Sequence, residues 1–188
     1  MLSKPFTCSG CSLEERGRGY VPPSGPADSP ILFVGEAAGP DEAAQGIPFV
    51  GAAGGVLNRL LARNHQVRDN SRVDNVIRCC PPGMWFDPRA PYYFSARQHC
   101  TTAHLSTTLA EGHQVVVPLG GTALRYLLQM DRDVRVEDWH GTVTRDPSDR
   151  FWLVPTFHPS FLQRGAMNLF GVVSFDLQQA LKVAADGF

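Results

Sequence analysis

The chain has 188 residues, of which 43% are hydrophobic and 19% charged, and its formal net charge is -1 at pH 7. This length suits one domain with a substantial core, and the near-neutral charge argues against a strongly basic nucleic-acid-binding protein. No apolar run approaches the ~18 residues that a membrane span needs, and the first ten residues do not resemble a signal peptide. We therefore expect a single domain over residues 1–188, located in the cytoplasm.

The first thirty residues are rich in Gly, Pro and Ser and contain a Cys-x-x-Cys pair at Cys8 and Cys11. This composition predicts an irregular arm that something other than a core must hold. The apolar run at 31–34 then ends at Gly35, which is typical of a buried parallel strand that opens into a loop. Apolar residues at helical spacing predict a helix over 51–64.

Strands and helices alternate along the rest of the chain. Apolar runs predict strands at 73–77, 114–119 and 152–155, and the intervening patterns predict helices at 95–111, 122–129 and 168–184. This alternation predicts an α/β fold, a three-layer α/β/α sandwich with a central, mostly parallel four-stranded sheet. In such a sheet, ligands bind at the carboxyl ends of the strands.

Two signature loops each follow a predicted strand. The first runs from Gly35 through Glu42 to Gly51, and the second is His158-Pro159-Ser160. Glycines let the backbone approach a ligand closely, while a carboxylate and an imidazole supply proton and charge chemistry. Because both loops leave the carboxyl ends of strands, they indicate an active site.

Cationic side chains are unevenly distributed, with seven arginines against three aspartates in the segment 51–100. Planar guanidinium groups suit phosphate oxygens, so this segment predicts a modest phosphate-contacting face. A solvated helix face is the alternative. The arginines are Arg59, Arg63, Arg68, Arg72, Arg78, Arg89 and Arg97.

The five cysteines are Cys8, Cys11, Cys79, Cys80 and Cys100. A Cys-x-x-Cys pair with distant further cysteines is more typical of a metal site than of a disulfide in a cytosolic protein. Zinc and iron-sulfur clusters both accept four thiolates, and the spacing does not separate them. The alternative is a redox-active pair with the others as buried thiols. One of the two adjacent cysteines is expected to be spare.

Taken together, these motifs resemble those of the iron-sulfur uracil-DNA glycosylases, family 4 of the uracil-DNA glycosylase superfamily. Residues 35–51 are similar to the first family signature, 75–82 resemble its Asn-x-x-Lys-Cys-x-Pro-Pro pattern, and 157–160 resemble its second catalytic motif. Two departures stand out: Ala38 replaces a proline, and Ala43 replaces the aspartate after the signature glutamate. The second removes a carboxylate near the expected water, so the rate or the preferred base is open to change.

The resemblance implies a 4Fe-4S cluster that anchors the arm. Its ligands would be Cys8, Cys11, Cys79 and Cys100, whereas Cys80 falls on a position that is not a ligand in the family pattern. On the same resemblance, Phe49 would stack on an everted uracil and Asn75 would read its edge. The alternatives are that Phe49 is an ordinary core residue and that Asn75 is a turn or cap residue.

The resemblance also assigns the chemistry. His158 would donate a hydrogen bond to uracil O2 as negative charge builds there, and Glu42 would position water for attack at C1′. Their alternatives are a structural histidine and a solvated loop acid. Contacts with the base, the water or the phosphates are expected from Gly35, Glu36, Ala37 and Ser160, with Arg59 and Arg164 as weaker phosphate candidates.

The expected function is a monofunctional DNA glycosylase that hydrolyses uracil from single- or double-stranded DNA and leaves an abasic site. The only two lysines, Lys4 and Lys182, are terminal, so no lysine is placed for a Schiff base. The competing functions are excision of another modified base, a cluster-bearing DNA-binding module with little turnover, and a zinc-stabilised nucleotide-binding protein. A monomer is expected.

Overall fold

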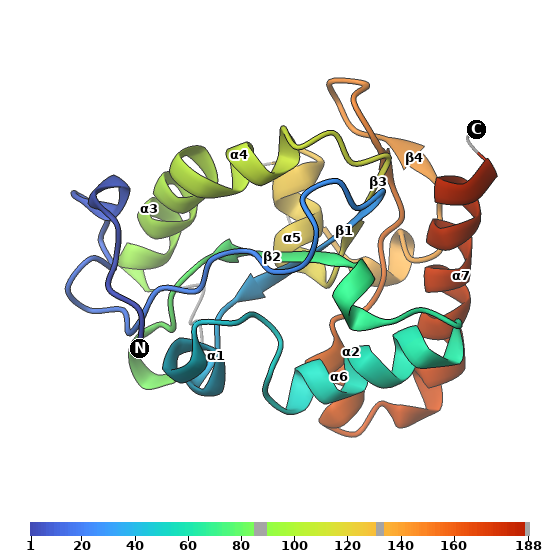
Figure 1. Ribbon diagram of the computed structural model, residues 1–188, viewed down its shortest axis with the longest axis horizontal. Coiled ribbons are helices and arrows are strands. Elements are labelled where there is room, and N and C mark those ends of the chain that lie inside the picture. Colours follow the sequence, from blue (N-terminus) through green and yellow to red (C-terminus); the bar gives the residue numbers. More distant parts are fainter. Residues whose placement is uncertain (85–89, 131–133, 187–188) are drawn as a thin grey trace.

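The computed structural model describes residues 1–84, 90–130 and 134–186, and its described strands form one twisted sheet with helices on both faces (Figure 1). The strand order is β2-β1-β3-β5-β4. Neighbouring strands run parallel except for β4 and β5, which pair antiparallel. The strands are β1 (Ile31–Ala37), β2 (Arg72–Ile77), β3 (Val115–Pro118), β4 (Thr144–Arg145) and β5 (Trp152–Leu153).

The predicted three-layer α/β/α architecture is confirmed, but the prediction of four strands is wrong because β4 adds a fifth. β4 has only two residues, Thr144 and Arg145, and neither is apolar and buried. β4 forms because it pairs with β5. Its own side chains therefore carry no sequence pattern that would predict a strand.

Two helical layers cover the sheet. One contains α2 (Ala52–Arg63), α6 (Pro159–Gln163) and α7 (Phe170–Asp186). In this layer α2 contacts both α6 and α7, and α7 lies against β1 and β3. The other contains α3 (Pro91–Cys100), α4 (Ser106–Leu109) and α5 (Gly121–Leu127), with α3 and α5 against β2. A short α1 (Pro40–Gln45) lies inside the first signature loop, where no helix was predicted.

The helix predicted at 95–111 is in fact three pieces. α3 begins earlier, at Pro91, and ends at Cys100. A π-helix, η4 (Thr101–Leu105), follows it, and α4 continues to Leu109. Wider π turns change which side chains face the sheet, and they occur frequently at functional sites.

β1 and β3 lie in the core, which is why their sequences are continuous apolar runs. Leu32, Val34, Val116 and Val117 are all completely buried, because helices cover both faces of these central strands. The register places Gly35 opposite Asn75, so the carboxyl ends of β1 and β2 meet. None of the described helices is long and apolar enough to cross a bilayer.

The arm of residues 1–30 runs along the open edge of β2. Isolated bridges join Arg18 to Cys80 and Ser24 to Val73. Leu13 and Val21 are 0% and 1% exposed, so the arm is held partly by apolar burial, contrary to the expectation that it lacks a core contribution. By pairing with β2, the arm also covers the edge of the sheet.

Candidate active site and cysteine cavity

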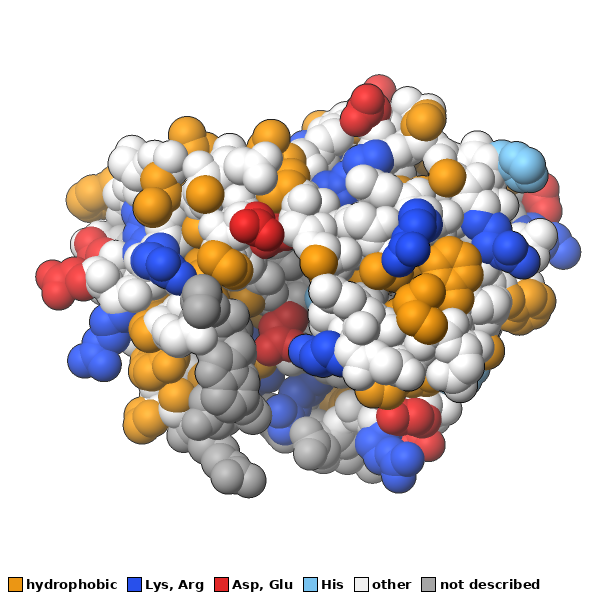
Figure 2. All heavy atoms as spheres, turned by 90° about the horizontal axis from the view of Figure 1, so that it is seen from below, with side chains coloured by type: hydrophobic (Ala, Val, Ile, Leu, Met, Phe, Trp, Pro, Cys, Tyr) orange, Lys and Arg blue, Asp and Glu red, His pale blue; other side chains and the backbone are white. Residues whose placement is uncertain are grey.

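The two signature loops meet at a cavity of about 810 Å³ at the carboxyl ends of the strands. The first loop contributes Glu36 and Ala37, and the second contributes His158 and Ser160. Seen from below, the molecule is hollowed near its centre, and acidic and basic side chains gather around the hollow (Figure 2). The expected meeting of the two loops is therefore what the fold produces.

Gly35, Phe49 and Asn75 form a tight cluster beside this cavity. A Cβ atom on Gly35 would lie only 2.4 Å from Asn75 Oδ1 and 2.6 Å from Phe49 Cζ. Phe49 itself has a φ of 55°, in the left-handed region, which is uncommon for a residue other than glycine. The loop therefore holds the residue that carries this ring in an uncommon backbone conformation. Any side chain at position 35 would therefore fill the space between ring and amide.

The Asn75 amide is buried without a complete set of partners. Its residue is 2% exposed, and Oδ1 has no hydrogen-bond partner. Buried polar atoms in native proteins almost always have partners, so this acceptor beside an aromatic ring is available to an N–H donor that enters the site.

His158 faces Phe49 from the second loop, with ring centroids 5.7 Å apart and an interplanar angle of 31°. It caps the start of α6: the backbone N–H of Ser160 donates to His158 Nδ1 at 3.1 Å, and Ser160 Oγ lies 2.8 Å from the same atom. Because Nδ1 accepts a hydrogen bond, the neutral ring carries its proton on Nε2. Burial, with a smaller contribution from Arg164, lowers the pKa of His158 to about 4.

Glu42 is a buried residue and not the solvated loop acid that was the alternative. It lies in α1 at 8% exposure, and its Oε1 accepts the backbone N–H of Gly51 at 2.9 Å. A Cβ on Gly39 would come within 2.5 Å of Glu42 Oε2. The carboxylate therefore lies between Gly39 and Gly51 of the first signature loop.

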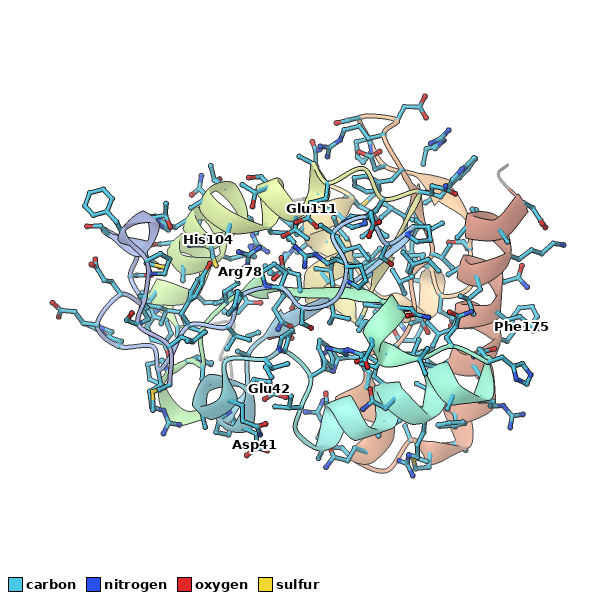
Figure 3. All side chains as sticks on the ribbon, viewed as in Figure 1. Asp41, Glu42, Arg78, His104, Glu111 and Phe175 are labelled. Atoms are coloured by element: carbon cyan, nitrogen blue, oxygen red, sulfur yellow. The ribbon has the colours of Figure 1, made fainter. Side chains whose placement is uncertain are left out.

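The two neighbours of Glu42 in α1 differ in exposure. Ala43 is 2% exposed and lies against Gly19 of the arm. Asp41 is exposed and lies beside Glu42 at α1 (Figure 3), and a Cβ atom on Gly51 would come within 2.9 Å of its Oδ2. The sequence hid this because residues 40–45 were read as a loop, without helical side-chain directions.

Four of the five cysteines line a second cavity, between the arm, the end of β2 and α3. They are Cys8, Cys11, Cys79 and Cys100. Burial raises the pKa of Cys79 and of Cys100 to about 12, and the nearby cations Lys4 and Arg78 oppose that effect. Cys80 does not line this cavity; its Sγ lies 4.0 Å from Arg18 Nη2.

The family model of the uracil DNA glycosylase superfamily matches residues 22–180. The chain belongs to this superfamily. The Type-4 uracil-DNA glycosylase of Thermotoga maritima is 33% identical over 181 residues, which cover 92% of this chain and 87% of that relative. The Type-4 uracil-DNA glycosylase of Archaeoglobus fulgidus is 43% identical over 77 residues, 41% of this chain and 39% of the relative.

In this superfamily member, residues that were not predicted complete the wall of the cavity. Tyr93 of α3 and Thr122 of α5 both line it, and their hydroxyl oxygens lie 3.2 Å apart. Thr122 also hydrogen-bonds Glu36; burial raises the pKa of Glu36, and Thr122 and Arg164 oppose that shift. The only sequence signal for Thr122 was the Gly120-Gly121 step that precedes it.

The predicted phosphate-contacting face of segment 51–100 is not a single surface. Arg72 pairs with Glu111, Arg78 pairs with Asp74, and Arg68 donates to Pro48 O at 2.8 Å. Arg59 and Arg63 are exposed on α2, and Arg89 lies outside the described residues. The arginines around the cavity of this superfamily member are Arg97, Arg125, Arg135 and Arg164.

Proposed function

We propose that this protein is a monofunctional uracil-DNA glycosylase, which takes uracil out of DNA and hydrolyses its N-glycosidic bond to leave an abasic site. The observation that carries the proposal is the orphaned, buried Asn75 Oδ1 beside Phe49, with His158 across the ring. The names of the similar relatives support it. The partner would be single- or double-stranded DNA, and the active unit a monomer with one domain.

Base selection follows from the Asn75 amide. Uracil presents an N3–H donor next to the O4 acceptor, so Oδ1 can accept from N3 while the amide N–H group donates to O4. Cytosine presents the opposite polarity on the same edge, which would leave two buried polar groups unpaired. Phe49 would stack on the face of the base, and the absence of a side chain at Gly35 leaves room for its edge.

Bond cleavage separates charge, because the sugar becomes cationic while the uracil becomes anionic. His158, holding its proton on Nε2, would donate to uracil O2 as that charge builds, in a site that needs no reorganisation. Glu42 would orient the attacking water and offset the charge on the sugar. Backbone groups at Gly35, Glu36 and Ala37 would contact the base or the water, and Ser160 a phosphate.

The neutral state of His158 predicts an unusual acid limb in the pH profile. Protonation at Nδ1 would place a second donor against the Ser160 N–H, so activity should fall only as the pH approaches about 4, where the pKa lies, and not near the ordinary value of 6.5. Single-turnover rates measured from neutral pH downward test this. Arg164→Gln removes a charge that lowers the pKa, so its limb should move to higher pH; a wild-type limb near the ordinary value would contradict the assignment.

The cysteine cavity fits the proposed 4Fe-4S cluster. Four thiols, two of them buried and two partly exposed, line this cavity together with the cations Lys4 and Arg78, and a 4Fe-4S cluster takes four thiolate ligands. Among the described residues, no three His, Cys, Asp or Glu side chains converge on one ion position, a convergence that a cluster does not require. When bound, the cluster would supply a rigid junction between the arm, β2 and α3.

Adjacent cysteines offer a matched test of the ligand set. Cys79→Ser should abolish the visible absorbance and lower the iron content from about four per chain toward zero, because one corner of the cluster loses its thiolate. Cys80→Ser should leave both unchanged, since that thiol lies outside the cavity. Zinc in place of iron in the purified protein, or equal losses in the two variants, would contradict the proposal.

The decisive test of function is excision from an oligonucleotide with one uracil, followed by alkaline cleavage of the abasic product. Matched oligonucleotides with thymine, cytosine or hypoxanthine test base choice. Uracil should be removed and the others left intact. Ala43, the departure from the family pattern that left the preferred base open, is buried against Gly19 of the arm. Preferred release of hypoxanthine, or no release at all, would contradict the proposed function.

A further inference from the structure

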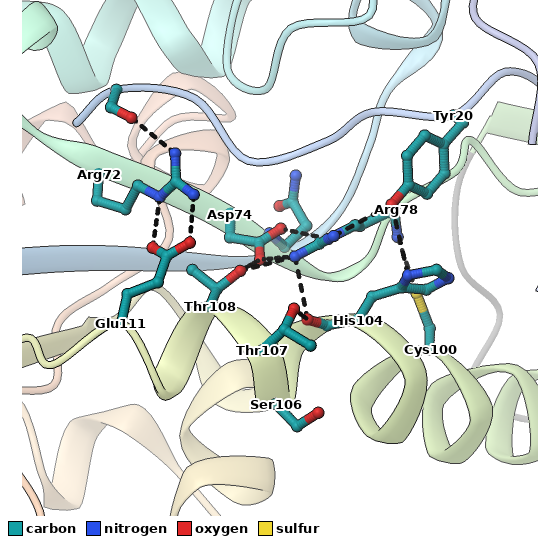
Figure 4. A network of polar contacts seen from close by, with 12 residues as sticks. Tyr20, Arg72, Asp74, Arg78, Cys100, His104, Ser106, Thr107, Thr108 and Glu111 are labelled. Carbon is teal, nitrogen blue, oxygen red and sulfur yellow. Dashed lines mark hydrogen bonds and ion pairs between the residues drawn. The ribbon is translucent and has the colours of Figure 1, made fainter. Parts of the chain in front are cut away.

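A buried ion pair on β2 lies between the cysteine cavity and Asn75. Asp74 is 1% and Arg78 5% exposed, and the guanidinium group holds the carboxylate with two bonds, Nε to Oδ1 at 3.0 Å and Nη2 to Oδ2 at 2.6 Å (Figure 4). Nη1 donates to the Tyr20 hydroxyl at 3.1 Å, and Nη2 also donates to Thr108 Oγ1 at 2.7 Å. A fork with this many fixed partners has little freedom to move.

One end of this pair reaches the base-reading residue. Asp74 Oδ1 also accepts the backbone N–H of Asn75 at 2.8 Å. That N–H points to the outer side of β2, as does the N–H of Val73, which donates to Ser24 of the arm. Side chains alternate along a strand, so Asp74 and Asn75 lie on opposite faces. Asp74 therefore fixes the backbone that carries the Asn75 amide toward Gly35.

The other end reaches the cysteine cavity. The backbone N–H of Arg78 donates to Cys100 Sγ at 3.3 Å, and Cys79 is the next residue in the chain. Arg78 Nη2 also donates to the backbone carbonyl of His104 at 3.2 Å, and His104 Nε2 lies 3.3 Å from Cys8 Sγ. Arg78 is thus linked to three of the four cavity cysteines. It bonds Cys100, precedes Cys79 in the chain, and reaches Cys8 through His104.

We propose that Asp74 and Arg78 are positioning residues that couple the cluster-binding segments to Asn75, so that the arrangement of the cysteine cavity sets how the amide is presented to the base. The part of this inference that is measured as kcat/KM for uracil rests on the proposed function. The coupling itself rests on the contacts above, because it runs through one bidentate ion pair with a discrete geometry.

The same strand supplies a matched control. Arg72 holds Glu111 in the same bidentate way, with Nε to Oε2 at 2.8 Å and Nη2 to Oε1 at 2.5 Å, but it contacts neither Asn75 nor the cysteine cavity (Figure 4). Arg78→Met should lower kcat/KM for uracil about tenfold and shift the backbone amide resonance of Asn75, whereas Arg72→Met should do neither. Equal effects in the two variants would overturn the coupling.

A double-mutant cycle separates positioning from general stability. In an Asn75→Ala background, Arg78→Met should change kcat/KM less than about twofold, because the residue through which it acts is gone. Additive losses would overturn the inference. Should Arg78→Met fail to fold, Arg78→Gln keeps a polar side chain and removes the charged fork; it should retain the visible absorbance, shift the Asn75 resonance and lower kcat/KM several-fold. A glutamine variant identical to wild type in resonance and rate would also overturn the inference.

Failure of the proposed function gives a different pattern. Wild-type protein that does not excise uracil would refute the glycosylase activity. The Asn75 resonance in Arg78→Met and Arg72→Met still decides whether the ion pair positions the amide, since that measurement needs no turnover.

Discussion

Replacing His158 with alanine should lower kcat for uracil excision about 10²- to 10³-fold while the Kd for uracil-containing DNA changes little, because the lost hydrogen bond matters chiefly once charge has developed on the base. The hydrogen-bond geometry sharpens this expectation. Ser160 donates to Nδ1, so Nε2–H is the donor left for the base. Single-turnover excision and equilibrium binding to the same duplex measure the two quantities separately.

Controls for this variant come from the same chain. His65→Asn replaces an exposed histidine outside the cavity and should leave kcat unchanged. Ser160→Ala removes the hydroxyl but keeps the backbone donor to Nδ1, so its loss should be much smaller than that of His158→Ala. A nitrogen NMR spectrum showing the proton on Nδ1, or near wild-type turnover in His158→Ala, would refute the assigned role.

The fold was predictable from sequence where burial dominates. β1 and β3 are covered on both faces, so their residues are uniformly apolar and their positions follow from the run of side chains alone. β4 and α1 were missed for the opposite reason. Thr144 and Arg145 form a strand only because Trp152 and Leu153 pair with them, and that pairing is a tertiary fact.

The sequence named several side chains that the structure brings together, such as Phe49, Asn75 and His158, but not their environment. Glu42 and His158 could be named from their loops, yet their burial, the Gly51 contact and the direction of the Nδ1 bond depend on how the loops close. The arginines show the limit most clearly. Arg72 has its partner 39 residues away, so the count of charges in a segment did not reveal which side chains are internal.

Gly35→Ala should reduce kcat/KM for uracil at least about 10²-fold without unfolding the protein, since a misplacement of the order of 1 Å in a reacting group has effects of this size. Alanine suits the strand conformation at this position, but its Cβ would lie 2.4 Å from Asn75 Oδ1 and 2.6 Å from Phe49 Cζ. Both neighbours are buried, at 2% and 6% exposure, so the ring and the amide must separate or rotate, and the slot for the base is filled.

Gly55→Ala is the matched control, because a Cβ there meets nothing within 4 Å, and it should leave kcat/KM within about twofold of wild type while favouring the helix slightly. The comparison isolates steric filling from the general effect of replacing a glycine. Thermal unfolding and visible absorbance should be similar in the two variants, and the loss in Gly35→Ala should appear for every uracil-containing substrate. Full activity in Gly35→Ala would mean that uracil does not enter between Phe49 and Asn75, and the base site would have to lie elsewhere.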